Sequence, residues 1–350
     1  MKFGLKEGFI IFNESFFISG QEFMEPFIAL RRERLNRGIR FAHARCLEIG
    51  ALIDPVLCRE NGNVFYADHL STEELKEQFA WNTNFDSRQL VEIDYIWKKE
   101  CALKECVDGQ FDYVIASHVA EHVPDLIGWI EEIRQILKPD GQLRLVLPDG
   151  RYSFDMKRQP TRLADLLAAW LKKSTCPETH LVLDFALNKI NDKDIPRIHA
   201  EYGLYPDKEN LESQIPFSEV LEWGERTLIP DHYEDIHCWV LHLGLFVKLM
   251  MNLAEHGLIK MACVEWFDID PSKLSYEFTV FLVSEKNREK CVESWKEVYE
   301  KIRNSPYQFS FAQHLEQENT KLKQELTAIQ NSFCWRVTSP LRQLVKLFKS

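Results

Sequence analysis

Short apolar runs alternate with helix-like segments from Arg45 onward, and this alternation limits the possible folds more than any other feature of the sequence. Such an order is typical of a parallel sheet whose strands are joined by crossover helices. The fold class is therefore predicted to be α/β. Parallel strands are expected at 46–49, 64–67, 90–93, 111–116 and 143–147.

A hairpin and several helices complete the pattern. Segments 259–267 and 276–283 are strand-like, and the short connection between them indicates an antiparallel pair at the end of the sheet. Apolar residues at helical spacing predict a helix over 126–137, and the Lys-Pro-Asp-Gly sequence at 138–141 predicts a turn after it. Further helices are expected at 161–173, 178–189, 217–226 and 242–256.

The chain is expected to divide into three parts. Residues 1–40 are predicted to form an N-terminal helical cap, and 41–285 the main domain. Within that domain, 149–240 is longer than the usual connection in an α/β unit and is interpreted as an insertion on the substrate side. Residues 286–350 are predicted to form C-terminal helices, a short coiled coil and a basic amphipathic tail.

The charge balance and the cysteines exclude several classes of protein. Forty-three basic against 54 acidic residues give a net charge of −11, which argues against a nucleic-acid partner. Nine cysteines without a CxxC pair indicate buried thiols in a reducing compartment, as at Cys46 and Cys263. No signal peptide or membrane-spanning helix is expected, so the predicted location is the cytoplasm.

Small and acidic residues follow the first strands, where a cofactor can bind in an α/β fold. Gly50 ends the first strand, but no GxGxxG pattern follows it, which favours a cofactor without a pyrophosphate. Asp68 can accept hydrogen bonds from a ribose diol, and Asp94, at the expected end of the third strand, from an adenine amino group. The alternative for each aspartate is a turn cap.

A histidine-rich loop follows the fourth strand. His118 and His122 are candidates for a general base, because histidine titrates near neutrality. Packed, hydrogen-bonded histidines are the alternative. A metal chelate with Glu121 is not expected, because the HxxEH pattern belongs on a helix and this stretch is predicted to be a loop.

The insertion carries two groups of candidate acceptor contacts. One group follows the fifth strand at its carboxyl end, the edge at which α/β enzymes bind substrates. The other is a polar and aromatic cluster that suits a sugar, with a capped helix start and a buried Trp239 as the alternative. A metal site of His232, Asp235 and His237 is not expected, because ligand types alone do not establish a coordination geometry. The candidate substrate residues are Asp149, Arg151, Tyr152, His232, His237 and Trp239.

The chain resembles class I S-adenosylmethionine-dependent methyltransferases in segments 47–50, 111–123 and 137–141 and at Asp68 and Asp94. The resemblance covers residues 40–285 and is closest to methyltransferases of type 11 from bacterial surface-polysaccharide gene clusters. It implies a Rossmann-like fold, with a seven-stranded, mostly parallel sheet, and S-adenosyl-L-methionine as the cofactor. It also implies that the cofactor is bound by Glu48, Gly50, Ala51, Asp68, His69, Asp94, Tyr95, Ser117 and His118.

The C-terminal part shows a second resemblance. Apolar residues over 312–333 alternate in steps of three and four, which indicates a short coiled coil or a single helix that packs on the body. Residues 331–342 resemble the C-terminal extension of glycosyltransferases and methyltransferases that build O-antigen. A homodimer or a glycosyltransferase partner is therefore expected through 312–333. The basic tail, 335–350, is a candidate for peripheral contact at the inner face of the plasma membrane.

Together these features predict an S-adenosylmethionine-dependent methyltransferase that O-methylates a sugar in surface-polysaccharide biosynthesis, on a glycan or a lipid-linked precursor. The general base is expected among His122, His118 and His237. One alternative is an inactive methyltransferase-fold scaffold in a glycan assembly complex, because Leu52 and Asp54 stand where many members of the family have glycine. A glycosyltransferase is the third possibility.

Overall fold

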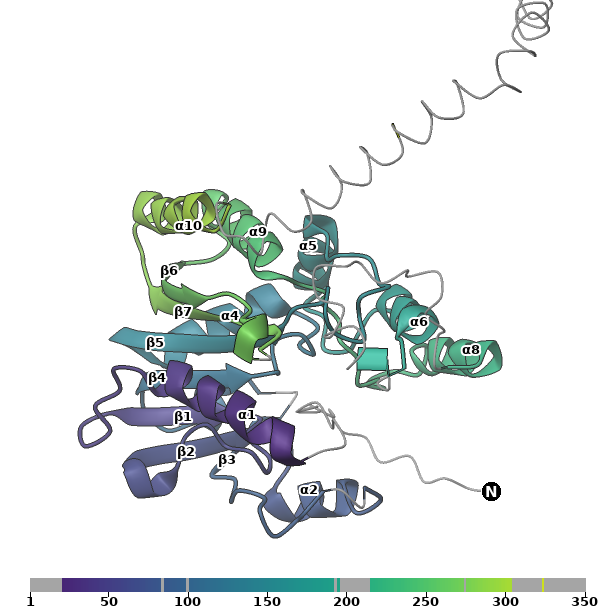
Figure 1. Cartoon of the computed structure of the whole chain (residues 1–350), viewed down its shortest axis with the longest axis horizontal. Helices are drawn as coiled ribbons and strands as arrows, with labels where there is room; N and C mark the ends of the chain where they lie inside the picture. The colour runs from purple at the N-terminus through teal and green to yellow at the C-terminus, as the bar shows by residue number, and fades with distance from the viewer. Residues whose placement is uncertain are drawn as a thin grey trace, which may run out of the picture.

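The computed structural model describes residues 21–82, 85–98, 101–191, 194–195, 215–273, 275–303 and 323. Within these ranges the chain forms one seven-stranded sheet in the order β3-β2-β1-β4-β5-β7-β6 (Figure 1). Strands β1 to β5 run parallel, and β7 is antiparallel to both β5 and β6. The α/β class and the terminal hairpin are thus confirmed. The strands are β1 (Arg45–Ile49), β2 (Asn63–Asp68), β3 (Tyr95–Ile96), β4 (Phe111–Ser117), β5 (Leu137–Pro148), β6 (Met261–Phe267) and β7 (Glu277–Ser284).

One predicted strand is wrong, and one predicted turn is an irregularity inside a strand. Segment 90–93 is not a strand, because Leu90 is buried in a small side cluster and the sheet pairing falls instead on Tyr95, which lies opposite Ala67. The turn expected at 138–141 lies within β5. There the register against β4 shifts. Leu137 pairs with Phe111, but the next pair is Gln142 with Tyr113, so β5 has three more residues than β4 over this stretch.

The helices lie close to their predicted positions. The described helices are α1 (Gln21–Asn36), α2 (Thr72–Gln78), α3 (Leu103–Cys106), α4 (Leu126–Ile136), α5 (Leu163–Lys172), α6 (Thr179–Asn188), α8 (Phe217–Arg226), α9 (Leu243–Glu255) and α10 (Arg288–Ile302), with short 3-10 turns at Arg59–Asn61 and Pro271–Lys273. Figure 1 shows α1 across one face of the sheet and α6 beside α8 in the insertion. None of the described helices is long and apolar enough to cross a membrane.

The core is divided by the sheet into two parts. Along β4, Val114 and Ala116 belong to the larger cluster, and Ile115 between them belongs to the smaller one. This alternation follows from the two-residue period of a strand, which directs successive side chains to opposite faces. Cys46 and Cys263 are buried free thiols, as predicted, and burial raises the pKa of each to about 12.

Candidate functional site

The carboxyl ends of the parallel strands bring the predicted cofactor residues to one edge of the sheet. Gly50 follows β1 with a φ of +71°, a conformation that glycine adopts without steric cost, and its N–H donates to the carbonyl of Ala67. Asp68 ends β2 and Ser117 ends β4. The register of β1 against both neighbours places these ends side by side.

Glu48 holds the loop after Gly50 through hydrogen bonds with its backbone. This carboxylate is buried, and it accepts hydrogen bonds from the backbone N–H groups of Val56 and Leu57 at 2.9 and 2.8 Å. Burial raises the pKa of Glu48 to about 7, although the two backbone donors favour the charged form. Both oxygens thus contact the backbone of the loop, so Glu48 holds the loop in place.

Asp68 keeps one carboxylate oxygen without a hydrogen bond to any described residue. Its Oδ1 accepts from the backbone N–H of His69 at 2.7 Å and lies 2.6 Å from the Nδ1 of the same histidine. Its Oδ2 is buried and has no hydrogen-bond partner among the described residues. His69 Nε2 and Ser117 Oγ, within the same described ranges, are buried and unpartnered too. Because buried polar atoms are nearly always satisfied, these three atoms fit a polar ligand at this edge.

The two predicted adenine contacts are engaged elsewhere. Asp94 precedes β3, and its Oδ2 accepts from the backbone N–H of Tyr66 at 2.8 Å and from Arg59 at 2.7 Å. The Tyr95 hydroxyl bonds with Arg45 and Asp108. Since Arg45 begins β1, the hydroxyl lies at the amino end of the strand, away from Gly50. The placement therefore argues against Tyr95 as a cofactor residue.

His118 lies in a buried network of charges. Its φ is +54°, and its Nε2 lies 2.8 Å from Glu277, while its Nδ1 lies 3.3 Å from Glu121. Arg31, from α1, also donates to Glu277, at 2.8 Å. Burial and Arg31 would lower the pKa of His118, but the two glutamates outweigh them and raise it. With both ring nitrogens facing carboxylates, His118 is poorly placed to accept a proton from a substrate.

His122 and His237 come from distant parts of the chain and meet in the structure. Their rings are 4.7 Å apart and nearly perpendicular. His122 Nδ1 lies 2.8 Å from Asp235, and His237 Nδ1 lies 2.5 Å from Asp155. Burial would raise the pKa of Asp155, but His237 and Arg158 hold it well below its usual range. Sequence reasoning assigned no role to either His–carboxylate pair, because the partners are 82 and 113 residues apart.

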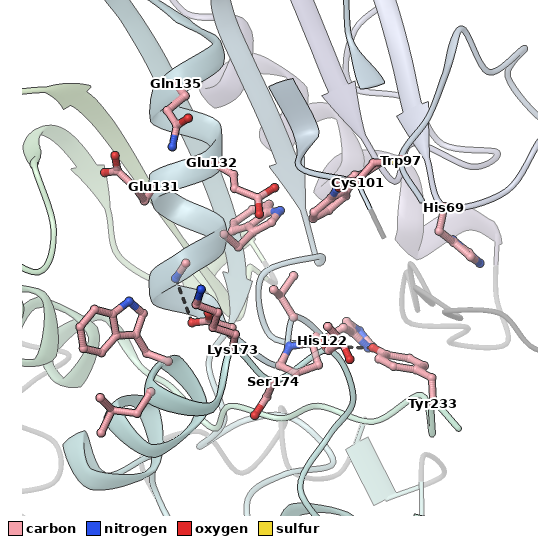
Figure 2. A pocket seen from close by; sticks show the side chains of 18 residues that line it. His69, Trp97, Cys101, His122, Glu131, Glu132, Gln135, Lys173, Ser174 and Tyr233 are labelled. Carbon is pink, nitrogen blue, oxygen red and sulfur yellow. Dashed lines mark hydrogen bonds between the residues drawn. The ribbon is translucent and has the colours of Figure 1, made fainter. Parts of the chain in front are cut away.

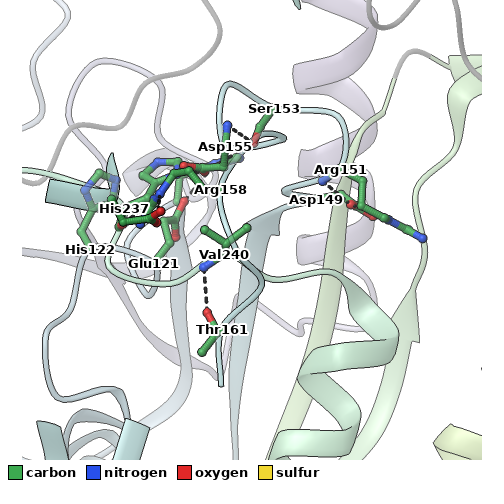
Figure 3. Close-up of polar contacts among 12 residues, drawn as sticks. Glu121, His122, Asp149, Arg151, Ser153, Asp155, Arg158, Thr161, His237 and Val240 are labelled. Atoms are coloured by element: carbon green, nitrogen blue, oxygen red, sulfur yellow. Dashed lines mark hydrogen bonds and ion pairs between the residues drawn. The ribbon is translucent and has the colours of Figure 1, made fainter. Parts of the chain in front are cut away.

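The remaining predicted substrate residues are mostly occupied by structural contacts. Asp149 is fully buried and pairs with Arg151, whose Nε and Nη2 donate at 2.8 and 2.5 Å. Tyr152 packs against Tyr276. Figure 3 shows Asp149 and Arg151 apart from the His122 and His237 group.

Two predicted sugar contacts in the second cluster are also structural. Trp239 is 1% exposed, and its ring N–H donates to the carbonyl of Val123 at 2.7 Å, so its placement fits the alternative of a buried tryptophan. His232 lies 2.7 Å from Glu234. The proposed trio of His232, Asp235 and His237 is not formed, because each of the three has a different partner.

A cavity of about 690 Å³ lies between α4, α5 and the loops after β2 and β3 (Figure 2). His69 and His122 line it, so it adjoins both the sheet edge at Asp68 and the pair of His122 and His237. Four large aromatic side chains contribute apolar ring faces, and four charged groups contribute polar ones. These residues are Trp97, Trp129, Trp170, Tyr233, Asp125, Glu131, Glu132 and Lys173. The cavity therefore suits a ligand with both apolar faces and hydroxyl groups.

The predictions for the C-terminal part lie outside the described residues. This applies to the coiled coil at 312–333, the tail at 335–350 and the O-antigen-type segment at 331–342.

A family model described as a methyltransferase domain matches residues 21–204, just over half of the 350-residue chain. No curated protein matches the chain. Among solved structures, the chain is similar to the CurJ carbon methyltransferase, at 15% identity and a TM-score of 0.35, over 75% of this chain and 55% of that one. It is also similar to the CcbJ methyltransferase from Streptomyces caelestis, at 12% and 0.36, over 76% and 97% of the two chains. A third is the glycopeptide N-methyltransferase MtfA with bound S-adenosylmethionine, at 10% and 0.35, over 73% and 86%. The chain thus spans about half the length of the first of these proteins.

Proposed function

The chain belongs to the methyltransferase domain family, and on that premise we propose that it transfers the methyl group of S-adenosylmethionine to a hydroxyl oxygen of a sugar. One observation carries the cofactor part of the proposal. The buried Oδ2 of Asp68 has no hydrogen-bond partner in the described part of the chain, and it lies at the strand edge beside Gly50.

The residues at this edge suit the cofactor chemically. Asp68 Oδ2 can accept a hydrogen bond from a ribose hydroxyl, and the Ser117 hydroxyl provides a further polar contact. Gly50, without a Cβ, leaves room for a ligand to approach the backbone. When bound, S-adenosylmethionine supplies an electrophilic methyl group on a positively charged sulfur.

The acceptor is assigned to the cavity lined by Trp97, Trp129 and Trp170. Tryptophan faces pack against sugar rings, and the carboxylates of Asp125 and Glu132 can accept hydrogen bonds from hydroxyls. Of the three candidate bases, His122 lines this cavity. Asp235 holds its Nδ1, which leaves Nε2 as the nitrogen directed to other groups. Holding two reactants in adjoining sites supplies most of the rate enhancement in such a transfer.

The surface-polysaccharide context remains part of the proposal. It is supported by the resemblance of residues 331–342 to the extensions of O-antigen enzymes. In this proposal the enzyme acts in the cytoplasm on a glycan or a lipid-linked precursor. Residues 312–333 would join a second copy or a glycosyltransferase, and 335–350 would contact the membrane surface.

The test is calorimetric titration of S-adenosylmethionine and S-adenosylhomocysteine into the wild-type protein and Asp68→Asn. Hydrogen bonds to a charged group contribute about 1.5–3 kcal/mol, so the variant should bind roughly 10- to 100-fold more weakly. Asp140→Asn is the matched control, because Asp140 is exposed in the amino-terminal part of β5. Equal affinities of the three proteins, or no binding by the wild type, would contradict the proposal.

A further inference from the structure

We propose that Glu121, His122 and His237 form a binding site for a divalent transition-metal ion such as Zn²⁺. One potential ligand atom from each of the three lies within 4.8 Å of the others, and all three side chains are buried (Figure 3). Among the described residues, this is the one group of three or more histidine, cysteine or acidic side chains with that geometry. The ion itself would lie between two protein segments that the sequence separates by 115 residues.

Each histidine is held in the orientation that metal ligands need. Asp235 contacts Nδ1 of His122 at 2.8 Å, and Asp155 contacts Nδ1 of His237 at 2.5 Å. A carboxylate that accepts from Nδ1–H fixes the tautomer, so that Nε2 is the nitrogen that would bind an ion. Histidines that bind metals nearly always have such a partner on the other nitrogen. Two of them converging on one point are difficult to explain by packing alone.

The third ligand is a buried carboxylate whose contact with His118 is long. Glu121 is fully buried, and His118 Nδ1 lies 3.3 Å from its Oε1. Neither oxygen makes a hydrogen bond of good geometry with any described residue. A buried carboxylate is costly unless it is paired or coordinates a metal, so an ion would satisfy it.

The backbone holds the two segments together before any ion binds. The carbonyl of Glu121 accepts from the N–H groups of Cys238 and Trp239 at 2.7 and 3.2 Å. The Tyr233 hydroxyl donates to the carbonyl of His122 at 2.9 Å. These bonds fix His237 beside Glu121 and His122. Ligand atoms in a tetrahedral zinc site lie roughly 3.3 Å apart, so closure around an ion requires movements of only about an ångström.

The donor set indicates the class of ion. Two imidazoles and one carboxylate suit zinc and neighbouring first-row ions better than Mg²⁺ or Ca²⁺, which prefer oxygen ligands. Three protein ligands leave at least one position open for another molecule. His122 also lines the cavity, so the ion would lie close to the acceptor if the proposed function holds. An ion on Nε2 would take His122 out of proton transfer, so ion binding and a base role for His122 are alternatives.

The site is tested with the full-length protein, purified without a polyhistidine tag and freed of metal with a chelator. Zn²⁺ and Co²⁺ are titrated by calorimetry, and Co²⁺ also by visible absorption, which distinguishes nitrogen and oxygen ligands from thiolates. We expect one ion per wild-type chain, and no such binding in His237→Ala. His232→Ala is the matched control, because His232 lies in the same segment but pairs with Glu234.

A variant of the carboxylate that orients His122 distinguishes a metal site from a cluster that is only structural. Asp235→Asn should keep the ion but weaken its binding by about 10- to 100-fold, the usual effect of replacing a residue that hydrogen-bonds to a metal ligand. Far-UV circular dichroism and urea midpoints confirm that each variant folds. The proposal is overturned if the folded wild type binds no ion, or if His232→Ala loses as much affinity as His237→Ala. Titration of S-adenosylmethionine into the same samples scores the proposed function separately, because Asp68 lies outside the ion cluster.

Discussion

Replacing Glu277 by glutamine is expected to destabilise the protein by about 3–5 kcal/mol, the usual cost of breaking a buried ion pair. Arg31 contacts both oxygens of Glu277, through Nε at 3.1 and 3.2 Å and through Nη2 at 2.8 Å. Both side chains are only 2–3% exposed. Burial would raise the pKa of Glu277, but Arg31 and His118 lower it to about 2, so the charged form is the native one.

The magnitude follows from the charges that remain. In the wild type, Arg31 pairs with Glu277, and His118 lies between Glu277 and Glu121. Glutamine has nearly the same volume but a single neutral oxygen, so the buried guanidinium of Arg31 loses the negative charge that it faces. Because folded domains are stable by only about 5–15 kcal/mol, this loss is a large fraction of the total.

The assay is urea unfolding at pH 7, followed by far-UV circular dichroism. With a slope near 3 kcal/mol per molar, the midpoint should fall by about 1 M or more. A double variant, Arg31→Met with Glu277→Leu, removes both charges and should regain much of the loss, since apolar replacements of buried pairs are often neutral. The reasoning is refuted if Glu277→Gln costs less than about 1 kcal/mol, or if the double variant is no more stable than the single one.

Two further predictions concern residues that the sequence analysis linked to binding. The pKa of Glu48 is raised to about 7, so its contribution to stability is complete below pH 4.5 and is lost as the pH rises through 7. Between pH 4.5 and 8, the free energy of unfolding of Glu48→Gln, measured in urea, should rise by up to about 3 kcal/mol relative to that of the wild type. A difference between the two proteins that does not change with pH would contradict this. Trp239→Phe removes the hydrogen bond to Val123 and should lower the unfolding free energy by about 1–3 kcal/mol. It should leave the Kd for S-adenosylmethionine unchanged, and a large change in that Kd without loss of stability would contradict a purely structural role.

The sheet could largely be predicted because its strands are apolar runs bounded by turn residues. The exception is β3, which has only two residues and therefore no periodicity to detect. Its neighbour Leu90 is apolar because it packs with Leu75 and Phe79 beside α2, so burial in a side cluster resembled burial in a strand. Sequence patterns report burial more reliably than they report what covers a residue.

The position of a site residue could be predicted only where the end of a single strand determines it. Asp68 follows β2 directly, so strand order alone placed it at the edge with Gly50. The cluster of Glu121, His122 and His237 required a fold-back of the insertion onto the loop after β4, held by the backbone bonds to Glu121. The loop assignment of 118–122 is confirmed, and the chelate proposed above differs from the HxxEH pattern considered in the sequence. A third ligand from a distant segment does not need helical spacing.

The loop after Gly50 is the feature that motivated the scaffold alternative, and its structure weakens that argument. Leu52 has a φ of +46°, the left-handed conformation that glycine adopts in related loops without strain. The strain of such a residue costs about 1–2 kcal/mol. Its side chain is 4% exposed and packs with Leu75, Phe79 and Leu90, a burial that contributes about 1.5–3 kcal/mol. Its carbonyl also accepts from the N–H of Val91 at 3.0 Å. Burial of the leucine thus offsets the strain, and the loop keeps a tight turn without the glycine, so the substitution is not evidence that cofactor binding has been lost.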